Sequence, residues 1–227
     1  MDFNQPFTQK QKKFLEYITD KKRKGENQIP SLLVLSKELN ISSSTLREIL
    51  ELAKTLGLIE AHPRSGIELM PYSFKTPVIK SLGYAVMEDR KRFNEFSDLR
   101  IHLEKAYFKQ AAELLSVDDI EKIKEYIRRA KEKLHSSPVQ IPHPEHRQLH
   151  LSIYKNIKNE FVISLLQAYW MMYESIGLDL YTDLNYLMRV WDYHEKIVEA
   201  ISRGKFECGF ELLVEHMDMI KDIQIGK

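Results

Sequence analysis

The chain has 227 residues, enough for one large domain or two small ones, and it is 43% hydrophobic and 30% charged. This composition is that of a folded protein and excludes a disordered chain, and no apolar run approaches the roughly 20 residues that span a bilayer, so we expect no membrane contact. The formal net charge is +1, but residues 1–80 hold 13 Lys and Arg against 9 Asp and Glu, and residues 81–227 hold 21 against 24. The first third is therefore mildly basic, as expected of a part that meets a polyanion, although chance also produces differences of this size.

A single cysteine, Cys208, cannot form an internal disulfide, and the first residues lack the apolar core of a signal peptide. Both observations favour a reducing compartment. We therefore expect a cytoplasmic protein.

Three short helices and a hairpin are predicted over the first seventy residues. Thr8 is a good N-cap for a helix that ends near residue 23. Pro30 precedes a second helix that ends at Asn40, and the serines from Ser42 onward begin a third that stops at Gly57. The stretch "LIEAHPRSGIELM" then predicts two short strands around a turn. This order is typical of a winged helix-turn-helix, which we place at residues 1–72.

In a winged helix-turn-helix the second helix of the pair enters the major groove by its N-terminal end. Small polar residues and one arginine occupy that end here, and an arginine lies at the hairpin tip beside a glycine. Alternatively, the helices form a structural hairpin in which the serines only cap. The candidate DNA-binding residues are Ser31, Ser42, Ser43, Ser44, Thr45, Arg47, Arg64, Ser65 and Gly66.

The remainder of the chain has helical periodicity. Two prolines in "PYSFKTP" and the absence of periodicity there indicate a linker, which we place at residues 73–86. Residues 87–227 are expected to form an all-α bundle of about six helices. The expected helices lie near 87–115, 117–134, 144–157, 160–176, 185–203 and 205–224.

Four histidines fall on or beside the apolar faces of three of these helices. His146 and His150 are one helical turn apart, and His194 and His216 each lie within an apolar stripe of another helix. Buried imidazoles without partners cost stability, and one metal ion would satisfy all four. A hydrogen-bonded network in the core is the alternative.

The stretch "IPSLLVLSKELNISSSTLREILELAKTLGLIEAHPRSGIEL" resembles the DNA-binding domain of GntR-family bacterial transcription regulators. The match includes "PS" before the first motif helix, "RE" in the second helix and "R-x-G" in the wing. Leu33 and Ser43 occupy two positions where the family carries arginine, which implies a different operator or a lower affinity. The resemblance implies a homodimer that binds double-stranded DNA at a pseudo-palindromic operator.

Residues 90–224 resemble the helical ligand-sensing FCD domain of the FadR-type GntR subgroup, through "RIHLE", "HRQLH", "YHEKIVEAI" and "EHMDMI". In metal-binding members an Asp and three His of these motifs bind a divalent ion. His150, His194 and His216 match the three histidines, and His146 occupies the Asp position. A set of imidazoles favours Zn²⁺ or Ni²⁺ over oxygen-preferring ions.

The resemblance implies that a small carboxylate metabolite binds at the metal. Arg100 is the candidate counter-charge for its carboxylate. An i,i+4 pair with Glu104 on the helix surface is an equally good interpretation of Arg100.

We therefore expect a ligand-responsive transcription regulator, with a repressor favoured, and not an enzyme. One alternative is an effector-blind, dimeric DNA-binding protein whose bundle only dimerises. A second is a metal-dependent hydrolase, because a site of four imidazoles with open positions can activate water. A hydrolase does not explain residues 30–66.

Overall fold

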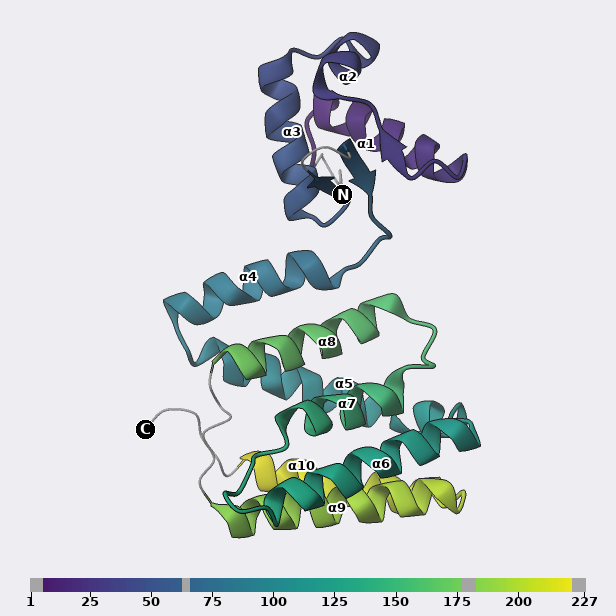
Figure 1. Cartoon of the computed structure of the whole chain (residues 1–227), viewed down its shortest axis with the longest axis vertical. Helices are drawn as coiled ribbons and strands as arrows, with labels where there is room; N and C mark the ends of the chain where they lie inside the picture. The colour runs from purple at the N-terminus through teal and green to yellow at the C-terminus, as the bar shows by residue number, and fades with distance from the viewer. Residues whose placement is uncertain (1–5, 63–65, 177–182, 222–227) are drawn as a thin grey trace, which may run out of the picture. The chain divides into compact units, whose positions relative to one another are not determined.

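The computed structural model describes residues 6–62, 66–176 and 183–221. The chain is mostly α-helical with one small sheet, which confirms the predicted fold class, and it divides into two compact units, Met1–Pro77 and Val78–Lys227 (Figure 1). Among the residues described, none of the helices combines the length and hydropathy needed to cross a bilayer.

The first unit is a helix-turn-helix followed by a hairpin. Two short helices are joined through a turn at Asn40, and a pair of antiparallel strands follows them, as the sequence predicts. The tip of the hairpin, with Arg64 and Ser65, lies outside the described residues. The elements are α1 (Gln9–Arg23), β1 (Gln28–Ile29), α2 (Leu32–Leu39), α3 (Ser43–Thr55), β2 (Ile59–His62) and β3 (Gly66–Leu69).

Local capping explains where these helices begin and end. The Thr8 hydroxyl accepts from the Gln11 backbone N–H, and the Gln11 side chain accepts from the Thr8 N–H, a capping box that starts α1. Asn40 adopts the left-handed conformation with φ 46°, which ends α2. Ser42 caps α3 by accepting from the Thr45 N–H at 3.3 Å.

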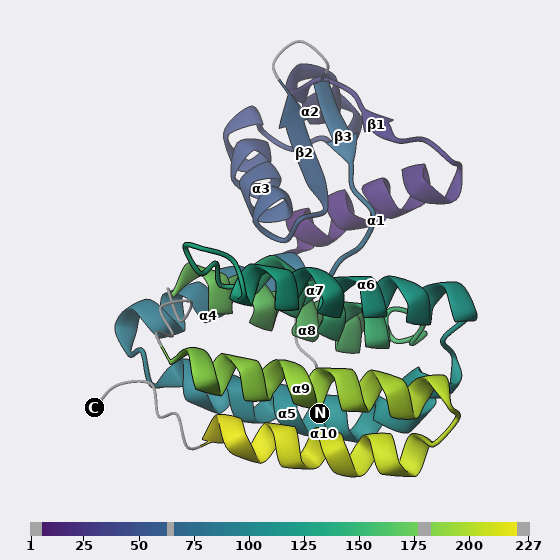
Figure 2. The ribbon, with the colours of Figure 1, turned by 60° about the horizontal axis from the view of Figure 1, so that its bottom comes forward.

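The small sheet contains a strand that the sequence analysis did not predict. The strand order is β1-β3-β2, all antiparallel, with Gln28 opposite Glu68 and Ile29 opposite Ile67 (Figure 2). A two-residue strand has no alternation to detect, so its pairing becomes visible only in three dimensions. The sheet packs on the helices around a core of Phe14, Ile18, Ile29, Leu35, Leu39, Ile41, Leu46, Ile49, Ala53, Ile59 and Leu69.

Most of the segment expected to be a linker, residues 73–86, is helical. Helix α4 runs Lys75–Glu88, and Pro77 lies in its first turn, where no intrahelical partner is available for a backbone N–H. Leu82 and Val86, four residues apart, are its buried positions. Pro77 therefore marks the start of a helix, and the boundary between the compact units falls within α4.

The second unit is the predicted all-α bundle. The helix expected from residue 87 begins instead at Arg92, because a turn at residues 89–91 separates it from α4. Helix α5 contacts α7, α8 and α10, while α6 packs on α7 and α9 (Figure 1). The helices after α4 are α5 (Arg92–Glu113), α6 (Val117–Leu134), α7 (His143–Tyr154), α8 (Glu160–Ser175), α9 (Leu184–Ser202) and α10 (Phe206–Lys221).

Two apolar clusters hold this bundle together. The larger one joins all the helices from α5 to α10 around residues such as Phe108, Leu149 and Trp191. The smaller one joins α4 and α5 to α8 and contains Leu82, Val86, Phe93, Tyr169, Trp170 and Met172. Four histidines, an arginine and a glutamate lie buried or half-buried among these apolar residues.

Candidate functional site

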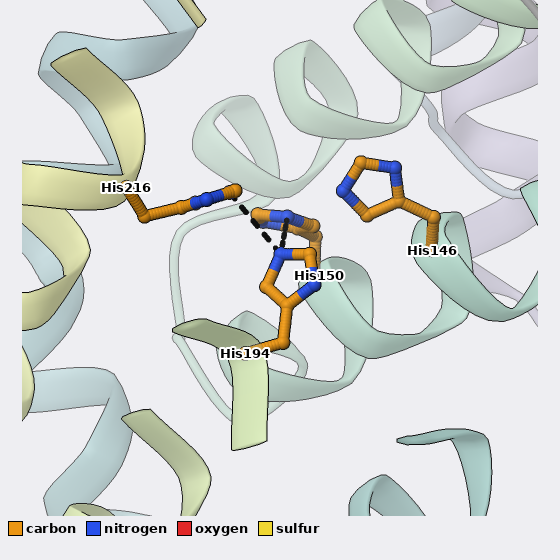
Figure 3. Close-up of side chains that lie close together, drawn as sticks. All are labelled: His146, His150, His194 and His216. Atoms are coloured by element: carbon orange, nitrogen blue, oxygen red, sulfur yellow. Dashed lines mark hydrogen bonds between the residues drawn. The ribbon is translucent and has the colours of Figure 1, made fainter. Parts of the chain in front are cut away.

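Three helices bring the four predicted histidines together. His146 and His150 come from α7, His194 from α9 and His216 from α10, and their rings are turned toward one another (Figure 3). One ring nitrogen of each residue lies within 4.8 Å of the corresponding nitrogen of every other. The structure thus places in one cluster all four residues that the sequence predicted as metal ligands.

The cluster is closely spaced at its centre. His194 Nε2 lies 3.2 Å from His150 Nε2 and 3.1 Å from His216 Nε2. Nitrogens bound to one tetrahedral Zn²⁺ at ~2.0–2.1 Å would lie about 3.3 Å apart. His146 is half-buried, but its Nε2 is buried without a hydrogen-bond partner among the described residues. These spacings and this unpartnered nitrogen fit a shared ion.

Hydrogen bonds among the described residues do not satisfy every nitrogen of this cluster. A neutral imidazole has one N–H donor and one acceptor nitrogen, so His194 Nε2 offers either one hydrogen or one lone pair to its two neighbours. Within the described part of the chain, His146 Nε2 has no hydrogen-bond partner in either case. A divalent cation accepts a lone pair from each nitrogen, so the donor set fits a metal ion better than a hydrogen-bonded core.

The histidines are held in the neutral form that binds metals. Burial lowers the pKa of each ring, and for His146, His194 and His216 the neighbouring histidines lower it further. For His150 the positive charge of Arg100 adds to the effect of burial. The pKa of His216 falls to about 3, and those of the other three fall well below their ordinary value.

An ion pair on α5 lies directly beside the cluster. Arg100 Nε donates to Glu104 Oε1 at 2.9 Å, and the two side chains are 2% and 0% exposed. The pair that the sequence suggested for the helix surface therefore exists, but its surface location was wrong. Glu104 was not among the predicted site residues, although its Oε2 lies 3.2 Å from His150 Nδ1.

Arg100 is enclosed by aromatic rings and soft acceptors. Its guanidinium carbon lies 4.8 Å from the Tyr169 ring centroid and 5.2 Å from that of Trp170. Nη1 contacts Met217 Sδ at 3.4 Å, and Nη2 lies 3.4 Å from His150 Nδ1. Among the described residues, neither terminal nitrogen has a carboxylate partner. The charged end of Arg100 thus retains donors that a small anion could use.

The predicted DNA-binding residues that the structure describes lie at the start of α2, in the first part of α3 and at the start of β3. Arg47 is exposed on α3, one turn in from the cap. Ser42 uses its hydroxyl for capping and for contacts with Ser44 and Thr45, so part of this polar group stabilises the helix start. Ser31 caps α2 without a side-chain hydrogen bond, Ser43 is half-buried, and Gly66 opens β3 with φ 93°.

Leu33 lies on the surface of α2, where the family pattern carries an arginine. Leu33 is 64% exposed and its neighbour Val34 is 42% exposed. An apolar side chain at this position cannot contact a phosphate as an arginine would. Within α2 and α3 the one arginine is Arg47, while Arg64 lies outside the described residues.

Comparisons with known proteins agree on one family. The FCD domain family matches residues 95–219, more than half of the chain and the region that holds all four histidines. "HTH-type transcriptional regulator LutR" from Bacillus subtilis (strain 168) is 20% identical over 208 residues, covering 89% of this chain and 94% of LutR.

Solved structures share the fold. Streptococcus agalactiae GntR has a TM-score of 0.69 at 19% identity, and the match covers 94% of this chain and 98% of the Streptococcus chain. E. coli McbR/YncC has a TM-score of 0.50 at 14% identity, and the match covers 95% of this chain and 97% of McbR/YncC. With the winged unit preceding the matched helical domain, the chain belongs to the FCD-domain group of the GntR family of transcription regulators.

Proposed function

We propose that this regulator senses a small organic acid through a metal ion in its helical domain and changes its binding to operator DNA in response. The observation that carries the proposal is the convergence of four neutral imidazoles from three helices, within 4.8 Å of one another. Membership in a family of DNA-binding regulators supplies the output.

The donor set favours a borderline transition metal. Four neutral nitrogens suit Zn²⁺ or Ni²⁺ better than Mg²⁺ or Mn²⁺. Because the imidazoles carry no charge, the ion's two positive charges would be uncompensated by its ligands. The adjacent Arg100–Glu104 pair is neutral as a unit and does not change this balance. Such a site should attract an anion.

A carboxylate suits the surroundings of the cluster. When bound, the ion supplies an open coordination position for an oxygen of the effector. Arg100 would hold the same carboxylate through its terminal nitrogens, which contact a thioether and a ring nitrogen in this structure. The aromatic rings of Tyr169 and Trp170 would exclude water from the pair.

Trp170 provides a path from the site to α4. Its ring centroid lies 4.8 Å from that of His146 and 4.9 Å from that of His150. The same side chain belongs to the apolar cluster that contains Leu82 and Val86 of α4. A change in the positions of these histidines would therefore alter the packing of the helix that follows the winged unit along the chain.

The DNA-bound form is proposed to be a homodimer. Two winged units related by a two-fold axis would read the halves of a pseudo-palindromic operator. We favour repression, with the effector releasing the DNA, and a cytoplasmic location beside the chromosome. The mildly basic charge of residues 1–80 is consistent with contact to phosphates.

The family consists of transcription regulators, so the hydrolase interpretation is wrong. An effector-blind regulator would explain the winged unit but not why the buried Nε2 of His146 has no hydrogen-bond partner among the residues that the structure describes.

The proposal is tested by measuring DNA binding as a function of metal and acid. Duplexes selected from a random pool on the wild-type protein serve as the operator, at one fixed salt concentration. Affinity is measured for chelator-treated protein, for Zn²⁺-loaded protein and for loaded protein with a panel of small carboxylates. We expect at least one acid to change the affinity of the loaded protein and not that of the His150→Ala variant.

Two further outcomes separate the parts of the proposal. Equal affinity in all metal and acid conditions would refute the sensing role and leave DNA binding intact. Arg47→Ala should weaken binding by ~1–3 kcal/mol, whereas the control Arg23→Ala, an exposed arginine at the end of α1, should change it little. An unaffected Arg47→Ala variant would refute the assignment of α3 as the recognition helix.

A further inference from the structure

His150 differs from the other histidines of the cluster in the surroundings of its outer nitrogen. His150 Nδ1 lies 3.2 Å from Glu104 Oε2 and 3.4 Å from Arg100 Nη2. The Nδ1 atoms of His194 and His216 are buried without a hydrogen-bond partner among the described residues. One carboxylate thus supports one histidine of the cluster.

The two neighbours of His150 Nδ1 favour opposite tautomers. If Nδ1 carries the hydrogen, it donates to Glu104, and the lone pair on Nε2 faces His194 Nε2 at 3.2 Å. If Nε2 carries the hydrogen, Nδ1 accepts from Arg100 and the lone pair points out of the cluster. Only the first tautomer makes His150 a ligand through Nε2.

The geometry favours the first tautomer. Each of the two hydrogen bonds includes one charged group, but the contact with Glu104 is the shorter one, and the Nε2–H tautomer would leave the Nδ1 lone pair facing the carboxylate at 3.2 Å with no hydrogen between them. The carboxylate is fixed in turn, because Arg100 Nε donates to its other oxygen and the Tyr154 hydroxyl donates to the Glu104 backbone carbonyl. Glu104 therefore has a defined place relative to α7.

We propose that Glu104 is a positioning residue for the metal centre: it holds His150 in the Nδ1–H tautomer and so presents the Nε2 lone pair to the ion. Arg100 acts one step further out by fixing Glu104. This inference rests on the proposed metal site and assigns a function to a residue whose side chain does not belong to the ligand set.

The first test is a metal titration on a matched pair of double variants. Arg100→Met/Glu104→Leu and Arg100→Met/Glu104→Gln both remove the buried charges, so neither leaves a single ion in the core. The two side chains are similar in size, and only Gln offers an amide oxygen to the Nδ1–H of His150. Chelator-treated protein is titrated with Co²⁺ and followed by visible absorption.

We expect the Leu variant to bind Co²⁺ about 10- to 100-fold more weakly than the Gln variant, as is typical when the outer partner of a metal-binding histidine is lost. Equal affinities in the two variants, with Co²⁺ still bound by the wild type, would overturn the proposal. The comparison is internal, so a general loss of stability from removing the ion pair affects both variants alike.

The second test reads the tautomer directly in the metal-free wild type. Histidine ¹⁵N shifts distinguish Nδ1–H from Nε2–H, and the signals of His150 are identified by their loss in His150→Ala. We expect Nδ1–H. Finding Nε2–H would overturn the proposal. The tautomer can be measured even if the wild type binds no Co²⁺. Failure of the wild type to bind Co²⁺ would count against the metal site itself.

Discussion

The buried ion pair on α5 makes a quantitative prediction about stability. Arg100 and Glu104 are 2% and 0% exposed, so Arg100→Met leaves a carboxylate in the core without its counter-charge. Removing one partner of such a pair costs about 3–5 kcal/mol. Arg100→Met/Glu104→Gln leaves no buried charge and keeps an acceptor for His150. It should cost nearer 2 kcal/mol, mainly the lost cation–π contacts with Tyr169 and Trp170.

The double variant should therefore be more stable than the single one, and the difference should depend on pH. Burial raises the pKa of Glu104, and the loss of Arg100 removes the charge that opposes this rise. A carboxyl group with a raised folded-state pKa stabilises the fold at low pH and loses that contribution as pH rises. The deficit of the single variant should be smaller near pH 5 than near pH 8.

Peptide-resolved hydrogen exchange at increasing urea is the appropriate assay. Peptides from α5 and α9 report the free energy of unfolding of the bundle separately from that of the winged unit. The protein is treated with a chelator beforehand, so that bound metal makes no contribution to the measured stability. A double variant that is no more stable than Arg100→Met, or a difference that grows as the pH falls, would refute the argument from an uncompensated buried charge.

Three other perturbations have defined outcomes. His146→Ala should lower Zn²⁺ affinity on the order of 10-fold or more in a competition with a chromophoric chelator, and an unchanged affinity would make His146 a bystander. Gly57→Ala should lower the thermal stability more than Gly25→Ala, because an added Cβ at Gly57 would lie 2.8 Å from a neighbouring side chain, whereas Gly25 faces open space. Gly25→Ala should cost only about 1–2 kcal/mol, which is the cost of its positive φ. Equal losses in the two variants would contradict this expectation. Lys155 holds the pKa of Asp119 well below its usual range, so this carboxylate stabilises the fold above its ordinary pKa and loses that contribution in acid. In the Asp119→Asn variant the urea concentration at the unfolding midpoint should therefore fall less steeply as the pH is lowered into the acid range. An unchanged pH dependence would count against the pairing of Asp119 with Lys155.

Much of the fold follows from periodicity and punctuation in the sequence. The i,i+4 spacing of His146 and His150 and the apolar stripes around His194 and His216 were sufficient to place all four on inward faces. Thr8, Asn40 and Gly57 mark helix ends through capping and left-handed geometry, which are local properties of the chain. The helix ends predicted from these caps agree with the structure.

Features that depend on distant contacts could not be predicted in the same way. Glu104 and His150 are 46 positions apart, and the spacing of Glu104 from Arg100 is equally compatible with an exposed pair. Strand β1 exists because Ile29 pairs with Ile67 across the sheet, not because of its own sequence. Helix α4 was missed because Pro77 reads as a helix breaker unless its position in the first turn is known.

The aromatic surroundings of the histidines give the protein an optical signal of its own. The chain contains two tryptophans, and the ring centroids of Trp170 and Trp191 lie 4.8 Å and 5.8 Å from that of His146. All tryptophan emission therefore arises within a few ångströms of the candidate metal centre, and none comes from the winged unit. Paramagnetic Ni²⁺ bound there would quench this fluorescence, whereas Zn²⁺, with its filled d shell, would not. Quenching in an unlabelled sample should thus report a site filled by a paramagnetic ion, and Zn²⁺ that displaces Ni²⁺ should restore the emission.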